Sequence, residues 1–224
     1  MTVRGVARAW FGATAVVVAV ALVIQLVVAA SSPGIVFPNP AARTANVLAF
    51  FTIQSNIIVG ITTGLLAHRP ERDSWWFRTF RLDGPVCILV TFAVYHTVLA
   101  GLADLTGWAK AADVLLHTVV PAMCVLGWAA FGPRGRLTGT VVLGSLLYPL
   151  AWLAVTLIRG AITDWYPYPF LEAPRLGYAQ VLLNSLLIAA VFLALAALAW
   201  GIDRLVARRK HPARVAERQD APAN

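Results

Sequence analysis

The sequence predicts an all-α integral membrane bundle of six transmembrane helices with both termini in the cytoplasm. Three observations predict it: the composition, six long apolar stretches, and the distribution of basic residues between them. Hydrophobic residues make up 59% of the 224 residues and charged residues only 12%, and the mean hydropathy is +0.74. A soluble domain carries roughly 25% charged residues. A soluble core would not hide this much apolar surface, whereas a bilayer does.

Six stretches are apolar enough to span a bilayer, which takes about 20 mostly apolar residues per helix. Helix-breaking segments separate them, such as Ser31-Ser32-Pro33-Gly34. Nothing remains for a second domain, so we expect a transmembrane domain over residues 1–206 and a disordered basic cytoplasmic tail over residues 207–224. The expected helices run over residues 6–30, 44–67, 82–103, 113–131, 137–158 and 176–206.

Basic residues set the expected orientation, because Lys and Arg concentrate in cytoplasmic segments. With the amino terminus inside, all but four of the 18 Lys and Arg residues lie on the cytoplasmic side. The four outside are Arg43, Lys110, Arg159 and Arg175. We therefore expect a multi-pass protein of the cell (plasma) membrane, with both termini cytoplasmic and membrane lipids as its partners.

Several other classes of protein are disfavoured. The net charge of +8 does not indicate a nucleic-acid partner, because the arginines lie at the ends of apolar stretches, where a membrane protein needs them. Cys87 and Cys124 lie within apolar runs and are expected to be buried thiols, and no Cys and His spacing suits zinc. The apolar run over residues 9–30 exceeds the roughly 7–15 residues of a signal-peptide core, which favours a spanning helix over a cleaved leader.

Polar residues within the apolar stretches indicate a functional site, because polar and ionisable side chains are costly in hydrocarbon and tend to face the bundle interior. With a rise of about 1.5 Å per residue, Thr52, His96 and His117 lie about 10–12 Å from the outer face on three different helices. Asn184 falls at a similar level on the sixth helix. We expect a polar pocket in the outer half of the bundle and a plainer inner half.

Helical spacing brings more side chains to this layer. Thr52, Ser55 and Asn56 lie at positions i, i+3 and i+4, so they share one helical face. Asp113 precedes His117 by four residues, so its carboxylate can reach the imidazole and fix its tautomer.

Two further features adjoin the same layer. Pro121 lacks the amide that would bond to the His117 carbonyl, which predicts a kink and a free carbonyl. Trp152 and Thr156 lie four residues apart on the fifth helix and are candidates for the lining of a pocket.

The pair of Thr52 and His117 points to acyl transfer. A threonine hydroxyl is a weak nucleophile that needs a base within hydrogen-bond reach, and a neutral histidine is the natural base. Thr52 would attack an ester carbonyl, and His117 would take and return the proton. Asn56, Asn184 or another donor would stabilise the oxyanion.

Each candidate also has a simpler structural explanation. Thr52 can bond back to the Leu48 carbonyl, as threonine often does in membrane helices. His117 and His96 can each serve as hydrogen-bond partners between helices. Asp113 can lie at the interface and face water.

Three segments, in matching order and spacing, resemble one protein family. They are Phe51-Thr52-Ile53-Gln54-Ser55-Asn56, Leu116-His117-Thr118-Val119-Val120-Pro121 and Trp165-Tyr166-Pro167-Tyr168-Pro169-Phe170-Leu171-Glu172. The resemblance is to the androgen-induced-gene (FAR-17a-like) family of multi-pass membrane threonine hydrolases, with its bacterial relatives. It covers the chain from about residue 50 to residue 184.

The resemblance implies an atypical threonine hydrolase, which in the animal members acts on fatty acid esters of hydroxy fatty acids. The family's essential threonine and histidine match Thr52 and His117, and its Tyr-Pro-Phe-Leu loop matches residues 168–171, as a structural lid at the outer interface. This chain departs from the animal members at residues 157–159, where they carry histidines, and its loop has an additional Tyr-Pro. Both departures affect which head group and which chain we expect the substrate to have.

The expected function is therefore that of a membrane-embedded lipid-ester hydrolase with Thr52 as nucleophile and His117 as base. No metal or organic cofactor is implied. The alternative is a non-enzymatic membrane protein that binds or carries a lipid or small molecule, in which the polar layer is a binding cavity or holds helices together. A carrier more often has broken helices or inverted repeats near the midplane, and neither is evident in the sequence.

Overall fold

The computed structural model describes residues 2–33, 36–132 and 134–210, and every regular element within those ranges is helical. Five of its helices are long and apolar enough to cross a membrane, and a sixth span results if one bent pair of helices counts as one. The prediction of an all-α, multi-pass membrane bundle is confirmed at this level. Its orientation in the membrane stays a prediction.

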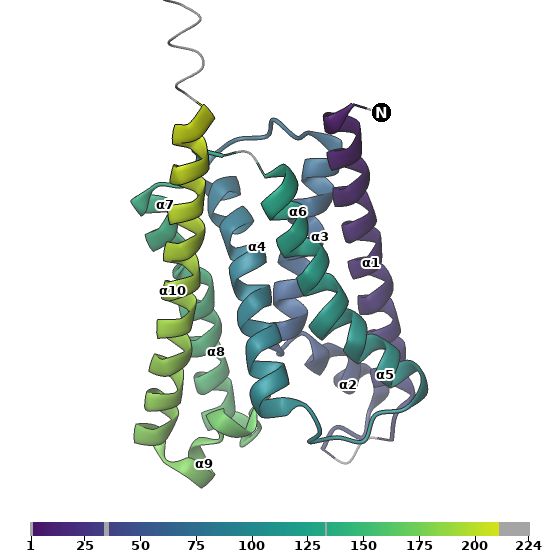
Figure 1. Ribbon diagram of the computed structural model, residues 1–224. Helices are drawn as coiled ribbons and strands as arrows, with labels where there is room; N and C mark the ends of the chain where they lie inside the picture. The colour runs from purple at the N-terminus through teal and green to yellow at the C-terminus, as the bar shows by residue number, and fades with distance from the viewer. Residues whose placement is uncertain (1, 34–35, 133, 211–224) are drawn as a thin grey trace, which may run out of the picture.

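The helices follow one another up and down the bundle (Figure 1). The amino terminus and the last described turn of the chain lie at the same end, which we call the terminal end. The spans are α1 (Val3–Ser31), α2 (Pro40–Val47) with α3 (Phe51–His68), α4 (Trp75–Val94) with the π-helical turn η1 (Tyr95–Leu99), α5 (Gly107–Val114) with the π-helical turn η2 (Leu115–Val119) and α6 (Val120–Phe131), α7 (Gly139–Gly144) with α8 (Leu147–Thr163), and α10 (Tyr178–Lys210). The short helices η3 (Pro169–Leu171) and α9 (Ala173–Leu176) lie in the loop before α10.

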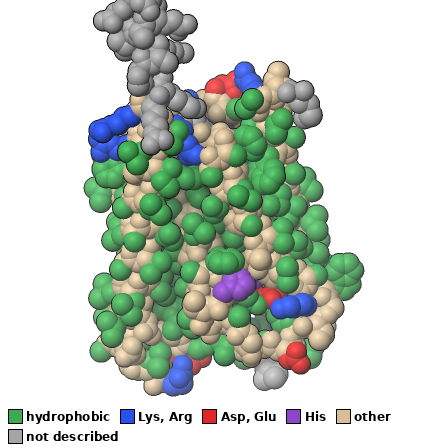
Figure 2. Space-filling view, in the orientation of Figure 1, with side chains coloured by type: hydrophobic (Ala, Val, Ile, Leu, Met, Phe, Trp, Pro, Cys, Tyr) green, Lys and Arg blue, Asp and Glu red, His purple; other side chains and the backbone are tan. Residues whose placement is uncertain are grey.

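Apolar side chains cover the middle of the molecule, and charged side chains gather at its two ends (Figure 2). Such a belt fits a protein that crosses a bilayer. Helices α3, α4 and α6 lie between α1 on one side and the pair α8 and α10 on the other (Figure 1). One core cluster joins α1, α3, α4 and α6 through Val18, Val59, Ile88 and Val120. Cys87 and Cys124 are buried free thiols, as predicted.

The second predicted helix is broken, which corrects the expectation of one continuous helix over residues 44–67. Helices α2 and α3 meet at an angle of 65° across the turn formed by residues 48–50. Side chains stabilise this turn by binding carbonyls that an unbroken helix would use. Gln54 Nε2 donates to the Leu48 carbonyl at 2.8 Å, and Trp152 Nε1 donates to the Ala49 carbonyl at 3.1 Å. Both donors lie after the break in the sequence, so the local pattern did not reveal it.

Three other helix boundaries differ from the predicted ones. Helix α4 begins earlier than predicted, where the Ser74 hydroxyl accepts a hydrogen bond from the Phe77 amide at 3.1 Å. Helix α8 runs beyond the predicted residue 158 and ends at Thr163, followed by the C-cap residue Asp164, which has a left-handed backbone with φ 52°. The last helix continues to Lys210, so residues 207–210 belong to the helix and not to the predicted tail. Residues 211–224 of that tail lie outside the described residues.

Candidate active site

Thr52 lies in the first turn of α3, immediately after the break between α2 and α3. Backbone amides in the first turn of a helix have no partner within that helix. The Thr52 amide donates instead to the Tyr168 hydroxyl oxygen at 3.3 Å, and the two hydroxyls lie 3.5 Å apart. The bond from Thr52 to the Leu48 carbonyl, the simpler explanation considered above, is not formed. The break therefore leaves the Thr52 hydroxyl available for other contacts.

The contact that sequence analysis proposed between Thr52 and His117 is present. Thr52 Oγ1 lies 3.4 Å from His117 Nε2. On the other side of the imidazole, His117 Nδ1 lies 3.0 Å from the Asp113 carbonyl and 3.0 Å from a carboxylate oxygen of the same residue. Both of these partners are acceptors, so we assign the proton to Nδ1. Nε2 then has a free lone pair that faces the threonine hydroxyl.

Asp113 is buried, so the explanation of an interfacial carboxylate facing water does not apply. Its second oxygen accepts a hydrogen bond from the Tyr95 hydroxyl at 2.6 Å and another from Lys110 Nζ at 3.2 Å. The Tyr95 ring also stacks on the His117 ring, with centroids 3.9 Å apart and an interplanar angle of 13°. Together these contacts hold the imidazole in one position and one tautomer.

Two π-helical turns place these side chains. Tyr95 begins η1, and His117 lies at the centre of η2. Single π-turns within α-helices are often found at functional sites. Pro121 follows η2 and has no amide hydrogen to donate to the His117 carbonyl. The sequence predicted a kink at this point, and the structure has a π-helical turn there.

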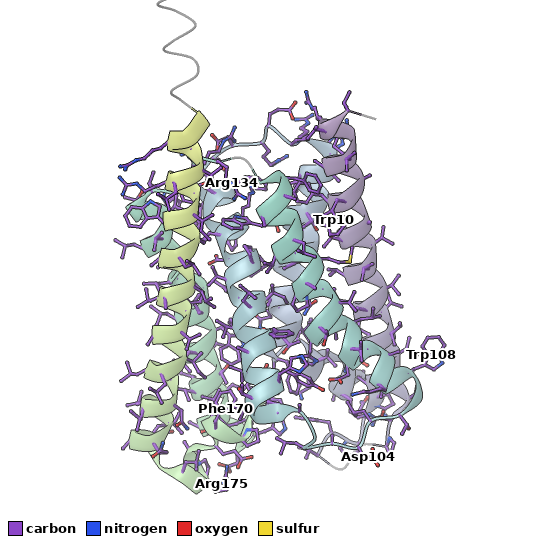
Figure 3. All side chains as sticks on the ribbon, in the orientation of Figure 1. Trp10, Asp104, Trp108, Arg134, Phe170 and Arg175 are labelled. Atoms are coloured by element: carbon purple, nitrogen blue, oxygen red, sulfur yellow. The ribbon has the colours of Figure 1, made fainter. Side chains whose placement is uncertain are left out.

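The loop between α8 and α10 supplies Tyr168, a neighbour of Thr52 that sequence analysis placed only in a structural lid. Burial raises the pKa of the Tyr168 phenol above its ordinary value, so its hydroxyl remains protonated and able to donate. The loop is held in place by Asn184, whose amide donates to the Phe170 carbonyl at 3.0 Å. Phe170 and Arg175 mark this loop beneath α8 and α10 in Figure 3. The Tyr-Pro-Phe-Leu motif was the available sequence signal.

A narrow apolar cavity of about 110 Å³ adjoins the Thr52 hydroxyl. Its walls come from α4, α8, α10 and the loop that carries Tyr168. Phe51, Trp152 and Phe192 are among the apolar side chains that line it, and none of the lining residues is charged. The cavity suits a hydrocarbon chain, which needs apolar walls and no ionic partner.

The other predicted residues of α3 lie near Thr52 and His117, but their side chains bond to backbone carbonyls. Ser55 bonds back to the Phe51 carbonyl at 2.8 Å. The Asn56 amide donates to the carbonyls of Thr52 and Leu116, at 2.8 and 3.3 Å, and so ties α3 to η2. Neither residue contacts the Thr52 hydroxyl.

His96 and Asn184 differ in role from the prediction, whereas Trp152 has the lining role considered for it above. His96 is exposed and contacts the Thr118 hydroxyl at 3.2 Å, away from Thr52. Trp152 lines the cavity and stabilises the helix break, while Asn184 anchors the loop. Asn184 was a candidate oxyanion donor, and its amide is engaged elsewhere.

The half of the bundle at the terminal end, which was predicted to be the plainer inner half, contains a buried polar side chain. Asp83 on α4 is fully buried, and neither carboxylate oxygen has a hydrogen-bond partner among the described residues. It lies eight residues from the start of α4, about 12 Å from the terminal end. No group of three or more His, Cys, Asp or Glu side chains within residues 2–33, 36–132 and 134–210 is arranged to hold a metal ion.

Comparison of the chain with protein-family models, with curated proteins and with solved structures found no match. The class of protein that the fold defines is thus a helical, multi-pass membrane protein. The arrangement of side chains around Thr52 is the feature of the structure that bears on its function.

Proposed function

We propose that this chain is a membrane-embedded lipid-ester hydrolase in which Thr52 is the nucleophile and His117 the general base. The observation that carries the proposal is the chain of contacts from Asp113 through His117 to Thr52, placed beside an apolar cavity. A nucleophile, a base in reach of it and a third group that orients the base together define nucleophilic catalysis. The contact of 3.4 Å is loose, as such contacts often are before substrate binds.

The proposed reaction has two acyl-transfer steps. Thr52 Oγ1 attacks the ester carbonyl carbon while His117 Nε2 takes the hydroxyl proton. His117 then returns that proton to the departing alcohol oxygen, which leaves an acyl group on Thr52. A water molecule, deprotonated by the same nitrogen, attacks this acyl group and releases the fatty acid and the free threonine. Asp113 stabilises the imidazolium that forms in each step.

Tyr168 replaces the asparagines as the proposed oxyanion donor. Its hydroxyl lies next to both the amide and the hydroxyl of Thr52. A carbonyl carbon bonded to Thr52 Oγ1 would hold its oxygen within reach of this phenol. A single such donor contributes about 10²–10³ in kcat in other acyl-transfer enzymes.

The proposed substrate is a lipid ester, of the type formed by a fatty acid and a hydroxy fatty acid. The apolar walls of the cavity beside Thr52 support an acyl chain, of which the cavity would hold a part. In this proposal the terminal end faces the cytoplasm of the cell and the site faces the outer leaflet of the plasma membrane, which the distribution of Lys and Arg supports. The resemblance of the Thr52, His117 and Tyr168 segments to the androgen-induced-gene family supports the same reaction.

A lipid-binding or carrier function is the alternative, and the broken span of α2 and α3 is the observation that favours it. The break precedes the 18-residue helix α3, which is about 27 Å long. It therefore lies near one face of the bilayer, whereas the broken helices of carriers lie near the midplane.

A fluorophosphonate probe tests the proposal directly, because it reacts preferentially with a hydroxyl that a neighbouring base has activated. We expect the purified wild-type protein to be labelled at Thr52, and we expect Thr52→Ala and His117→Ala each to abolish labelling. Thr63→Ala is the matched control, since the Thr63 hydroxyl bonds to the Val59 carbonyl of its own helix. An unlabelled wild type, or labelling that survives both substitutions, would favour the lipid-binding alternative.

A further inference from the structure

A second cavity, of about 490 Å³, lies on the other side of Trp152 from Thr52. It is formed by α2, the start of α3, α8 and the loops that carry Phe37 and Trp165. Unlike the apolar cavity, it contains a cation, Arg159, together with the polar side chains of Asn46 and Thr156. We call it the Arg159 cavity.

Arg159 is held in a fixed position within this wall. Its Nη2 donates to Asn46 Oδ1 at 2.5 Å, and the guanidinium lies 4.7 Å from the centre of the Trp165 ring. No carboxylate of the described residues lies within 4.0 Å of it. A guanidinium carries five N–H donors, so one bond to an amide leaves others free for an anion. A positioned cation without an anionic partner is what an anion site requires.

The Arg159 cavity and the apolar cavity share one wall residue, Trp152. The indole bonds to the Ala49 carbonyl and contacts the Phe51 ring, with centroids 5.0 Å apart. Ala49 and Phe51 belong to the short segment that leads into Thr52. Thr52 itself lines the apolar cavity, and Trp152 is the wall that this cavity shares with the cavity that contains a cation.

We propose that the Arg159 cavity binds a carboxylate at one end of the lipid ester, and that Arg159 is a specificity-determining residue for esters that carry one. This inference rests on the proposed function, because the acyl chain would occupy the apolar cavity while the ester bond lies at Thr52. The other arm of the ester then passes Trp152 and ends at the guanidinium. One guanidinium matches the single charge of a carboxylate, and the bond that Arg159 donates to Asn46 holds the guanidinium in the wall of the cavity.

Binding to a protein that performs no hydrolysis separates this inference from the catalytic proposal. We would measure the binding of tritiated oleate and of methyl oleate to purified Thr52→Ala protein in detergent. The expected result is a preference of about tenfold for oleate, as a charged hydrogen bond provides. Arg159→Gln removes the preference, and Arg159→Lys keeps part of it. Arg175→Gln, the matched control, keeps it whole, because Arg175 is paired with Glu172 and lies outside the cavity.

Three results would overturn the inference. Equal binding of oleate and methyl oleate to the Thr52→Ala protein would do so without any Arg159 variant. A preference for oleate that persists in an Arg159→Gln protein with an unchanged melting temperature would also overturn it. Arg159 would then serve only to join α2 and α8. Displacement of oleate by phosphatidylglycerol as effective as displacement by unlabelled oleate would assign the site to a phospholipid phosphate instead.

The same variant has a kinetic consequence. If Thr52 is the nucleophile, Arg159→Gln lowers kcat/KM about tenfold more for an ester of oleate with a hydroxystearic acid than for the methyl ester of the same compound. Inactivity of the wild type towards both compounds would contradict the catalytic proposal and leave the binding result to stand by itself.

Discussion

His117 shows how single residues set the chemistry of the site. Its imidazole is contacted on three sides: by Asp113 at Nδ1, by Thr52 at Nε2 and by the stacked ring of Tyr95. Each contact removes a degree of freedom from the ring. The threonine therefore meets a nitrogen that already has its lone pair in the required direction, which lowers the cost of reaching the reactive geometry.

Asp113→Asn tests whether the carboxylate assists the base. The Asp113 main-chain carbonyl still accepts from Nδ1, so the tautomer is retained in part, but the charge that stabilises an imidazolium is lost. We expect kcat for ester hydrolysis to fall about tenfold or more, with little change in KM. Asp104→Asn is the matched control, because Asp104 is exposed in the loop labelled in Figure 3. A normal kcat in Asp113→Asn would exclude Asp113 from the mechanism.

At the scale of elements, the site depends on how the loop before α10 packs on α8. Gly160 lies on α8 directly beneath the Tyr166 ring. A Cβ atom at residue 160 would lie 2.1 Å from Tyr166 Cε1, closer than any non-bonded contact allows. Two residues further along the chain, Tyr168 touches Thr52. The absence of a side chain at Gly160 thus determines how near the loop comes to Thr52.

We expect Gly160→Ala to displace the loop and to lower both the melting temperature and the rate of hydrolysis. Overpacking of this kind costs about 1–3 kcal/mol. Gly201→Ala is the matched control in α10, where an added Cβ meets no atom within 4 Å, and where alanine favours a helix more than glycine does. Thermal unfolding of both variants in the same detergent checks the prediction. Equal melting temperatures would mean that Tyr166 moves aside without cost.

At the scale of the whole molecule, the sequence predicted those features that depend on local composition. Six apolar stretches gave the spans, and spacings of four residues gave the contact between Asp113 and His117. The 65° break before Thr52 was missed, because the donors from Gln54 and Trp152 that stabilise it come from later in the chain. Tyr168 was missed as a member of the site for the same reason: its contact with Thr52 spans 116 residues.

The buried Asp83 was missed because the predicted helix began at residue 82, whereas α4 begins at Trp75. Asp83 can be compared with a second buried carboxylate. Asp83 has no hydrogen-bond partner among the described residues, whereas Asp203 on α10 accepts a bond from the Leu137 amide at 3.0 Å. Both side chains are almost completely buried, with exposed fractions of 0% and 1%. A buried polar group without a partner costs stability, while removal of a bonded one leaves its partner unsatisfied.

The same substitution should therefore have opposite effects at the two positions. Asp83→Ala removes two unpartnered oxygens, so we expect the melting temperature in detergent to rise, by the equivalent of about 1 kcal/mol or more. Asp203→Ala leaves the half-buried Leu137 amide without an acceptor, so we expect a loss of about 1–3 kcal/mol. If Asp83→Ala is instead as destabilising as Asp203→Ala, the Asp83 carboxyl makes a favourable contact in the membrane. A rise in stability without loss of hydrolysis would show that Asp83 serves neither folding nor the proposed reaction at Thr52, which lies in the opposite half of the bundle.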